Sequence, residues 1–439
     1  MLVILGCLCI LVQLAQGHPS PKVTYDGHKV LKILHHTQDD YRKLLRMELQ
    51  FGLDFWKLPK HVNDSMYVRV GPQHYDSFVK QLTGLNTVFS TLIEDVQDLL
   101  DSQSSPSVGQ TIHESRRAAS ALSSGMVLNT YHRYVAINNY LDDLTQLVLP
   151  RGVTATVQSI GTSEENRDVK LIKISSPTGL AAKRGIFIDG GIHAREWVSP
   201  ATVIYTIEQL AFNPKYDVGI NTLLERYDVF LVPVVNPDGY EYSHTNERMW
   251  RKNRKINTGS SCVGVDLNRN FPFQWAPAIG GSTNPCFDTF SGDSPGSEAE
   301  TANIVNFLRQ NGQNIDAYLT VHSYGQMWLY PWGFTSALPA DYLDLDSAAL
   351  SAVTAIRNTH NKRYDIGSST NVLYAAAGGS DDFAKGDTGI KYAYTIELRD
   401  VGRYGFALPT SEIIPTAEEF VAGLTALADN IYTRETGKK

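Results

Sequence analysis

The sequence predicts an α/β fold, in which helices sandwich a mixed β-sheet, preceded by a small α+β module. Two observations lead to this prediction. From about residue 118 onward, apolar runs of strand length alternate with segments whose apolar residues recur at helical spacing. Before that point, a shorter set of strand and helix patterns ends in a polar, Ser-rich stretch. Because strands covered by helices on both faces form parallel or mixed sheets, we expect a layered α/β architecture for the larger part.

The chain begins with an apolar run that ends in the small-x-small pattern Ala15-Gln16-Gly17. We interpret residues 1–17 as a secretory signal peptide, although the run is not preceded by Lys or Arg. A retained membrane anchor is the alternative, but the run is short for one. Because no later segment is long and apolar enough to span a bilayer, we expect a secreted, extracellular protein with no membrane partner.

The next elements predict a small ferredoxin-like module, because they follow the order β-α-β-β-α-β. Thr37 is a possible cap of the first helix, whose apolar residues include Leu44 and Leu49. Asn63 begins the only Asn-x-Ser/Thr glycosylation sequon of the chain. The predicted strands cover 28–34, 53–58, 65–71 and 87–95, and the helices cover 37–50 and a segment around 75–82.

Residues 101–120 are polar and rich in Ser, which is typical of a linker. Within them, Arg116 and Arg117 form a basic pair, and such a pair in an exposed linker is readily cleaved by a trypsin-like protease. A merely solvated pair is the alternative. Cleavage after Arg117 would separate residues 18–117 from residues 118–439.

In residues 118–439, the apolar pattern predicts the strands of the sheet and the helices that cover its two faces. The strands are expected at 155–161, 169–175, 184–190, 227–235, 317–323 and 391–398, and the helices at 138–149, 200–211, 297–310, 346–360 and 415–432.

Cysteine content and charge narrow the class of protein. Once the signal peptide is removed, only Cys262 and Cys286 remain, and two cysteines in an oxidising compartment most simply form a disulfide. Free buried thiols and zinc ligation are the alternatives. The formal net charge of -7 does not favour binding to nucleic acid.

Two histidines follow or end predicted strands, where an α/β sheet presents its ligands. His193 follows the strand at 184–190, with Glu196 three residues later, and His322 ends the strand at 317–323. Two histidines and a carboxylate, with one position left for water, form a common catalytic zinc site. Since the sequence lacks an H-E-x-x-H motif, Glu196 is better suited as a ligand than as a base. A helix start beside a hydrogen-bonded core histidine is the alternative.

Two basic segments, "ERMWRKNRK" (247–255) and "VDLNRNF" (265–271), place several guanidinium groups near the expected metal site. Arginine binds carboxylates in a bidentate manner, and Asn268 and Arg269 could together hold one. A solvated basic surface is the alternative. A metal site beside a carboxylate-binding site suggests an enzyme that acts at the free C-terminus of a peptide.

The motifs "HAREW", "MWRKNR", "GVDLNRNF", "HSYGQ", "AAGGSDDF" and "TIELRDVGRYGF" occur in the order found in the pancreatic-type zinc metallocarboxypeptidases. The resemblance spans about residues 118–435, and the preceding residues resemble that family's activation propeptide. It implies a zymogen in which residues 18–117 are the propeptide and residues 118–439 form a zinc carboxypeptidase fold with one Zn²⁺. The implied partners are peptide and protein C-termini and a trypsin-like activating protease, and we expect a monomer.

The resemblance also implies roles for individual residues. By motif, His193, Glu196 and His322 resemble the zinc ligands. Glu397 resembles the general base and acid that activates the zinc-bound water, although a salt bridge to Arg399 or Arg403 is an alternative. The remaining correspondences are Arg251 for polarising the scissile carbonyl, Asn268 and Arg269 for holding the terminal carboxylate, Tyr374 for closing over it, and Arg195, Ser323 and Tyr324 for lining the substrate groove.

The residue after "GGS" resembles the floor of the pocket for the terminal side chain, and here it is Asp381. An acidic floor implies release of Lys or Arg, as in B-type enzymes, and the small Ser369 and Gly333 resemble the pocket walls. Lys385 could approach Asp381 and reduce its effective charge. The alternatives are an A-type preference for apolar or aromatic C-terminal residues, and an inactive relative that binds peptides.

Overall fold

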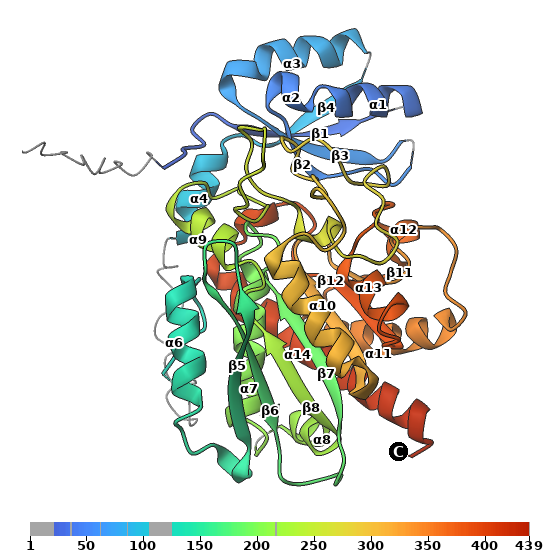
Figure 1. Cartoon of the computed structure of the whole chain (residues 1–439). Coiled ribbons are helices and arrows are strands. Elements are labelled where there is room, and N and C mark those ends of the chain that lie inside the picture. The colour runs from blue at the N-terminus through green and yellow to red at the C-terminus, as the bar shows by residue number, and fades with distance from the viewer. Residues whose placement is uncertain are drawn as a thin grey trace, which may run out of the picture.

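The computed structural model describes residues 22–35, 37–61, 63–85, 87–104, 125–215 and 217–438. The expected signal peptide and the expected cleavage site at Arg117 therefore lie outside the described residues. Within the described ranges, the chain forms a small N-terminal domain and a larger α/β domain, and the small domain lies at the top of the view in Figure 1.

The N-terminal domain has the predicted ferredoxin-like fold. Its antiparallel sheet has the order β2-β3-β1-β4, and its core includes Leu31, Val68 and Phe78. Thr37 caps the first helix by accepting a hydrogen bond from the backbone N–H of Asp40, as predicted. The elements are β1 (Lys29–Leu34), α1 (Gln38–Arg46), α2 (Glu48–Phe51), β2 (Asp54–Lys57), β3 (Ser65–Val70), α3 (Pro72–Gly84) and β4 (Val88–Ile93).

Two boundaries in this domain differ from the prediction. The helix expected at 37–50 breaks at Met47, whose N–H bonds back to the carbonyls of the preceding turn, and Leu49 is consequently 50% exposed. The expected linker begins later than predicted, because α4 (Val96–Ser104) includes its first four residues. Gln103 of that helix is buried and donates a hydrogen bond to the carbonyl of Leu408 at 3.0 Å. This contact with the large domain explains why a polar stretch is ordered.

The larger domain contains the predicted mixed sheet, with eight strands in the order β11-β10-β12-β9-β7-β8-β6-β5. Its centre, β12-β9-β7-β8, is parallel. The β6-β8, β5-β6 and β10-β12 pairs are antiparallel, and β11 pairs with β10 in parallel. The strands are β5 (Thr154–Thr162), β6 (Asp168–Ser175), β7 (Arg184–Gly190), β8 (Tyr227–Val232), β9 (Ile315–His322), β10 (Met327–Tyr330), β11 (Asp365–Ser368) and β12 (Tyr392–Glu397). β10 and β11 were not predicted.

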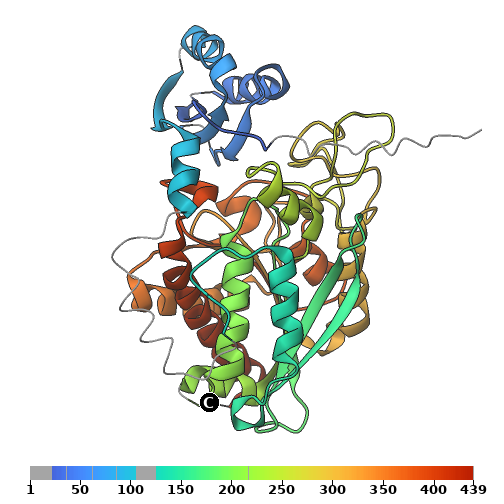
Figure 2. The same ribbon diagram turned by 90° about the vertical axis from the view of Figure 1, so that its left-hand side faces the viewer.

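Helices cover both faces of this sheet (Figures 1 and 2). One apolar layer joins the sheet to α7, α8, α11 and α14, and the other joins it to α10 and α13. The helices are α6 (Tyr134–Leu144), α7 (Val198–Phe212), α8 (Val218–Arg226), α9 (Pro237–Thr245), α10 (Ala299–Asn311), α11 (Tyr342–His360), α12 (Ser369–Val372), α13 (Ser380–Gly386) and α14 (Ile413–Thr436). Of these, α8, α9, α12 and α13 were not predicted.

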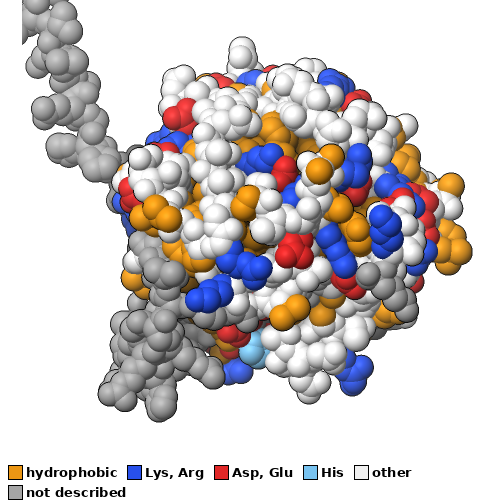
Figure 3. Space-filling model, turned by 90° about the horizontal axis from the view of Figure 1, so that it is seen from below, with side chains coloured by type: hydrophobic (Ala, Val, Ile, Leu, Met, Phe, Trp, Pro, Cys, Tyr) orange, Lys and Arg blue, Asp and Glu red, His pale blue; other side chains and the backbone are white. Residues whose placement is uncertain are grey.

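The two ends of the sheet differ in character. At the N-terminal ends of the parallel strands, charged side chains pair with one another, as in Lys391 with Glu435 at 2.7 Å. Seen from below, this end of the molecule shows basic and acidic side chains interspersed (Figure 3). At the opposite, C-terminal ends lie His322 and Glu397, the last residues of β9 and β12. Among the described residues, no helix combines the length and apolarity needed to cross a membrane.

The small domain packs over the C-terminal ends of the parallel strands. A shared apolar cluster includes Trp56 from the small domain and Met249 and Phe406 from the large one. The rings of Trp56 and Phe406 lie 5.3 Å apart between centroids. The hydroxyl of Tyr25 accepts a hydrogen bond from the backbone N–H of Met249 at 3.2 Å. The end of the sheet that carries the predicted site is therefore covered by the N-terminal domain (Figure 1).

Candidate metal centre

The turn after β7 positions the first two candidate ligands. Gly191 has a φ of +67°, and a Cβ at this position would lie 3.0 Å from Pro200. The hydroxyl of Ser199 accepts from the N–H of Gly191 at 2.9 Å and donates to the carbonyl of Val321 at 2.5 Å. This buried hydroxyl therefore ties the turn that carries His193 to the end of β9.

His193, Glu196 and His322 converge in the interior and are 4%, 3% and 1% exposed. Their ligand atoms all lie within 4.8 Å of one another. Glu196 Oε1 lies 2.8 Å from His193 Nδ1, Glu196 Oε2 lies 3.1 Å from His322 Nδ1, and the two Nδ1 atoms are 3.1 Å apart. Although burial alone would raise the pKa of Glu196, the two histidines lower it.

The donor set fits a zinc ion. Two imidazole nitrogens and a carboxylate oxygen are the ligands that zinc takes in catalytic sites, with one position left for water or substrate. The other ring nitrogen of His193, Nε2, lies 3.1 Å from Asp266 Oδ1. A carboxylate in this place orients a metal-binding imidazole and raises its basicity. In the part of the chain that the structure describes, no other cluster has the ligand geometry for a metal ion.

Asp266 was not predicted as a site residue, although it lies within the motif "VDLNRNF". It accepts hydrogen bonds from Arg251 at 2.9 and 3.1 Å, and Nη1 of Arg251 lies 3.9 Å from Glu196. Burial alone would raise the pKa of Asp266, but Arg251, Arg269 and His193 hold it well below the usual range. Asp266 therefore fixes Arg251 and His193 relative to each other.

Glu397 lies beside His322 in the parallel register of β12 and β9. Burial and the nearby Glu196 carboxylate raise the pKa of Glu397 to about 8. Its Oε2 atom is buried and has no hydrogen-bond partner among the described residues. Arg399, the alternative salt-bridge partner of Glu397, instead pairs with Glu412 and Glu419. Glu397 thus lies next to a candidate metal ligand and does not form the ion pair with Arg399.

Asn268, Arg269 and Tyr374 come together beside this centre. The side-chain oxygen of Asn268 accepts from the N–H of Ser380 at 2.9 Å. Arg269 donates to the carbonyls of Asn268 and Gly280 at 2.9 and 2.8 Å. Its guanidinium carbon lies 6.0 Å from the ring centre of Tyr374. The predicted carboxylate-binding residues are therefore neighbours.

The predicted groove residues Arg195, Ser323 and Tyr324 lie toward the N-terminal domain or the metal ligands. Arg195 donates to Asp54 of β2 at 2.8 Å, and both side chains are buried. The N–H of Ser323 donates to Glu196 Oε2 at 3.1 Å, and the ring of Tyr324 packs on Phe406. The guanidinium group of Arg195, a predicted groove residue, is thus bound by Asp54 of the N-terminal domain.

Asp381 lies at the start of α13 and is 5% exposed. Its carboxylate accepts from the hydroxyl of Ser369 at 3.3 Å, and burial raises its pKa. The adjacent Asp382 has a different role, because it accepts the backbone N–H groups of Gly333 and Phe334 at 2.9–3.1 Å. These contacts bring together the three predicted specificity residues.

Lys385 does not neutralise Asp381. Its ammonium group instead donates to Asp341 and to the carbonyl of Lys391, both at 2.8 Å. In the described ranges of the chain, Asp381 forms no ion pair with Lys or Arg.

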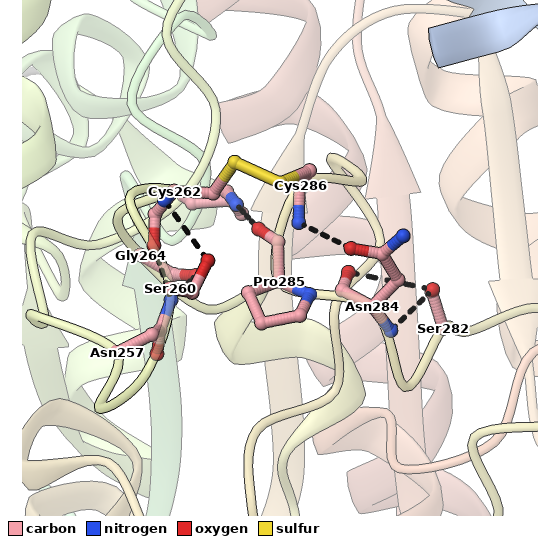
Figure 4. The surroundings of a disulfide bond; sticks show 9 residues. Asn257, Ser260, Cys262, Gly264, Ser282, Asn284, Pro285 and Cys286 are labelled. Carbon is pink, nitrogen blue, oxygen red and sulfur yellow. Dashed lines mark hydrogen bonds between the residues drawn. A yellow bond between two sulfur atoms is a disulfide. The ribbon is translucent and has the colours of Figure 1, made fainter.

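Cys262 and Cys286 form the predicted disulfide (Figure 4). The bridge closes a loop that contains Asp266, Asn268 and Arg269. Lys252 reinforces the loop by donating to the carbonyl of Pro285 at 2.6 Å. The bond therefore stabilises the segment that supplies three residues of the candidate site.

Family models match both parts of the chain. A model described as zinc carboxypeptidase matches residues 137–423, and a model described as carboxypeptidase activation peptide matches residues 31–103.

Curated relatives cover most of the chain. It is 49% identical over 303 residues to carboxypeptidase B of Astacus astacus, and the alignment covers 68% of this chain and 96% of that protein. It is 38% identical over 410 residues to carboxypeptidase A2 of Mus musculus, with 93% of this chain and 94% of that protein covered.

Solved structures share both domains. The crystal structure of thrombin-activatable fibrinolysis inhibitor matches with a TM-score of 0.81 at 32% identity, over 92% of this chain and 99% of that chain. Carboxypeptidase A of Helicoverpa armigera matches with a TM-score of 0.81 at 29% identity, over 94% and 99%.

Proposed function

The chain belongs to the zinc carboxypeptidase family, and we propose that it is the zymogen of an enzyme that releases Lys or Arg from peptide and protein C-termini. It is therefore a zinc-dependent exopeptidase that carries an activation peptide. The proposal adds the side-chain preference, the roles of individual residues and the mode of activation.

In the proposed site, His193, Glu196 and His322 hold the zinc ion. When bound, zinc supplies a Lewis acid for the scissile carbonyl and lowers the pKa of a water ligand to about 7. Glu397 takes a proton from the attacking water and passes it to the leaving amine. The buried Glu397 oxygen that has no hydrogen-bond partner among the described residues supports this role, because it is available to accept a proton from water.

The arginines of the site position the substrate. Arg251, held by Asp266, stabilises the negative charge that develops on the carbonyl oxygen. Asn268 and Arg269 bind the terminal carboxylate through charge-assisted hydrogen bonds. Tyr374, which lies beside Arg269, closes over the bound terminus. Together these contacts select a substrate with a free C-terminus.

The observation that carries the B-type preference is the buried Asp381 carboxylate. Hydroxyl and amide groups are its neighbours, and Asp382 adds a second negative charge next to it. A cationic side chain from the substrate relieves both the burial of this charge and the repulsion from Asp382. The pairing of Lys385 with Asp341 leaves Asp381 available for such a substrate.

The preference is tested with the trypsin-processed protein and matched peptides ending in Lys, Arg, Leu or Phe. We expect preferential release of Lys and Arg. Asp381→Asn should lower kcat/KM for these two by about 10- to 150-fold, because a hydrogen bond to a charged group contributes about 1.5–3 kcal/mol. Asp365→Asn, at an exposed position, is the matched control. Preferential release of Leu or Phe by the wild-type enzyme would instead establish an A-type preference, which the similarity to carboxypeptidase A2 favours.

The mode of activation follows from the covering N-terminal domain. We propose that a trypsin-like protease cleaves after Arg117 and releases residues 18–117. The disulfide supports secretion, because such bonds persist in oxidising compartments. N-terminal sequencing of the processed enzyme tests the cleavage site, and a mature chain that does not begin at Ala118 contradicts it. We further propose a monomer, which is tested by sedimentation.

A further inference from the structure

The second zinc-ligand histidine is part of a buried hydrogen-bonded chain. His322 Nε2 lies 3.2 Å from the hydroxyl of Thr320, two residues earlier on β9. That hydroxyl lies 2.7 Å from Asp189 Oδ1 on the neighbouring strand β7. The other oxygen of Asp189 accepts the hydroxyl of Tyr318 at 2.5 Å. Asp189, Thr320 and Tyr318 are fully buried.

The sheet itself brings these groups together. In the parallel register of β7 and β9, Asp189 lies opposite Thr320. Tyr318, Thr320 and His322 alternate along β9 and therefore project from the same face. Asp189 is four residues before His193, so β7 carries Asp189 and leads into the turn that holds His193, while β9 carries Tyr318, Thr320 and His322.

The direction of the hydrogen bonds follows from the chemistry of each group. An ionised carboxylate only accepts hydrogen bonds, whereas a threonine hydroxyl has one hydrogen to donate and lone pairs to accept. Burial raises the pKa of Asp189 only to about 6, so the group is ionised at pH 8. Thr320 must then donate to Asp189, and its lone pair is left to accept the N–H of His322 Nε2.

We propose that Asp189, acting through Thr320, is a positioning residue that holds His322 with its proton on Nε2 and its lone pair on Nδ1. Nδ1 is the atom that lies 3.1 Å from both Glu196 and the Nδ1 of His193. The two histidines are thus oriented in different ways. The Nε2 atom of His193 contacts the carboxylate of Asp266 directly, whereas the Nε2 atom of His322 reaches the carboxylate of Asp189 through the hydroxyl of Thr320.

The proposal predicts the effect of single changes on zinc affinity, measured at pH 8 by competition with a chromophoric chelator. Thr320→Val removes the hydroxyl with little change in shape and should weaken zinc binding about 10- to 100-fold, the usual effect of losing such a partner. Thr320→Ser keeps the hydroxyl and should stay within about threefold of wild type. Thr206→Val removes a buried hydroxyl that bonds only within α7 and is the matched control.

A double-mutant cycle separates the relay from a general effect on packing. Asp189→Asn should weaken zinc binding, but in the Thr320→Val background it should add little, because the link to His322 is already broken. Additive losses from Asp189→Asn and Thr320→Val would overturn the relay, and so would wild-type affinity in Thr320→Val.

Nitrogen-15 NMR of the zinc-loaded wild-type protein provides a test that needs no variant. The expected signals of His322 are a protonated Nε2 and a metal-bound Nδ1, and the opposite assignment would overturn the proposal. The inference rests on the proposed zinc site, but the two fail differently. Wild-type protein that binds no zinc refutes the site, whereas normal binding with the opposite tautomer refutes only the relay.

Discussion

Replacing Asp54 with Asn should uncover the active site of the uncleaved protein. Asp54 lies on β2 of the N-terminal domain, and its carboxylate binds Arg195 at 2.8 Å and Arg69 at 3.0 Å. Trp56 donates to the same group at 2.9 Å. Asp54 and Arg195 are 5% and 2% exposed, so the ion pair between the two domains is shielded from water. Arg195 directly precedes the candidate metal ligand Glu196, so this contact joins the two domains beside the candidate metal centre.

The expected magnitude follows from the burial and charge of this pair. Although burial alone would raise the pKa of Asp54, Arg195 and Arg69 lower it from 3.8 to about 2. This shift corresponds to about 2 kcal/mol in favour of the ionised carboxylate. Removing one partner of a buried ion pair costs about 3–5 kcal/mol, but Asn keeps one acceptor oxygen. We therefore expect Asp54→Asn to weaken the domain contact by about 2–3 kcal/mol, which is roughly 30- to 150-fold.

The assay compares the hydrolysis of a small peptide ending in Arg before and after treatment with trypsin. The uncleaved Asp54→Asn protein should show a larger fraction of its fully processed activity than the wild type, by up to the factor above. The processed enzymes should be equally active, because cleavage removes residue 54. Asp39→Asn changes an exposed Asp of the same domain that pairs with Lys43, and it should behave as wild type.

The ion pair does not contribute to covering the active site if uncleaved Asp54→Asn keeps the low activity of the wild type while both domains remain folded, as judged by circular dichroism. In that case, apolar contacts such as that of Trp56 with Phe406 are sufficient to hold the N-terminal domain over the active site. A pH series gives a second check. Since the pKa of Asp54 is lowered on folding, its contribution is complete above about pH 4 and is lost as the pH falls toward 2.

Three further changes test other parts of the structure. Glu397→Gln should keep zinc and peptide binding, measured by chelator competition and calorimetry, but lower turnover by at least about 100-fold, and unimpaired cleavage would refute its role as the base. Glu48, in the N-terminal domain, has its pKa raised to about 8 by burial and by Asp288 and Asp54, so folding retains a proton that the unfolded chain releases above about pH 4.5. Wild-type thermal stability should therefore fall relative to Glu48→Gln as the pH rises from 4.5 to 8, and parallel melting curves across this range would contradict the assignment. Replacing Cys262 and Cys286 with Ser should lower the unfolding free energy by about 3–4 kcal/mol in denaturant titrations, as expected for a loop of this length, and an unchanged midpoint would show that the loop is held by other contacts.

The larger elements could be predicted because their patterns are long and regular. Each predicted strand of the large sheet exists. The central parallel strands were recognisable as nearly continuous apolar runs, whereas β5 alternates between apolar and polar residues. β11 was missed because Asp365 and Gly367 give it a low β-propensity, and it forms only by pairing with β10. Both α8 and α9 begin with residues typical of a helix start, namely a capping Asp217 and a capping Asn236 followed by Pro.

The site could be predicted only as far as motifs extend. His193, Glu196 and His322 lie at or just beyond the ends of predicted strands, and the motifs around them suggested their roles as ligands and that of Glu397 as the base. The contact of Asp266 with both His193 and Arg251 depends on a loop that folds back over the sheet, and sequence spacing does not show it. The ion pair of Asp54 with Arg195 joins residues 141 positions apart in two domains. Such contacts follow from the packed fold rather than from any local pattern.

Four buried carboxylates in and around the candidate site differ in their partners and in the direction of their pKa shifts. Asp54 and Asp266 have arginine partners, and their pKa values are lowered despite burial. Asp381 and Glu397 have no such partners among the described residues, and burial raises their pKa values. Burying a carboxylate without a cation costs folding free energy, and such groups are frequent at functional sites. Under the proposed function, the reason for such burial at Asp381 is a cationic substrate side chain, and at Glu397 it is a proton that must arrive and leave during hydrolysis.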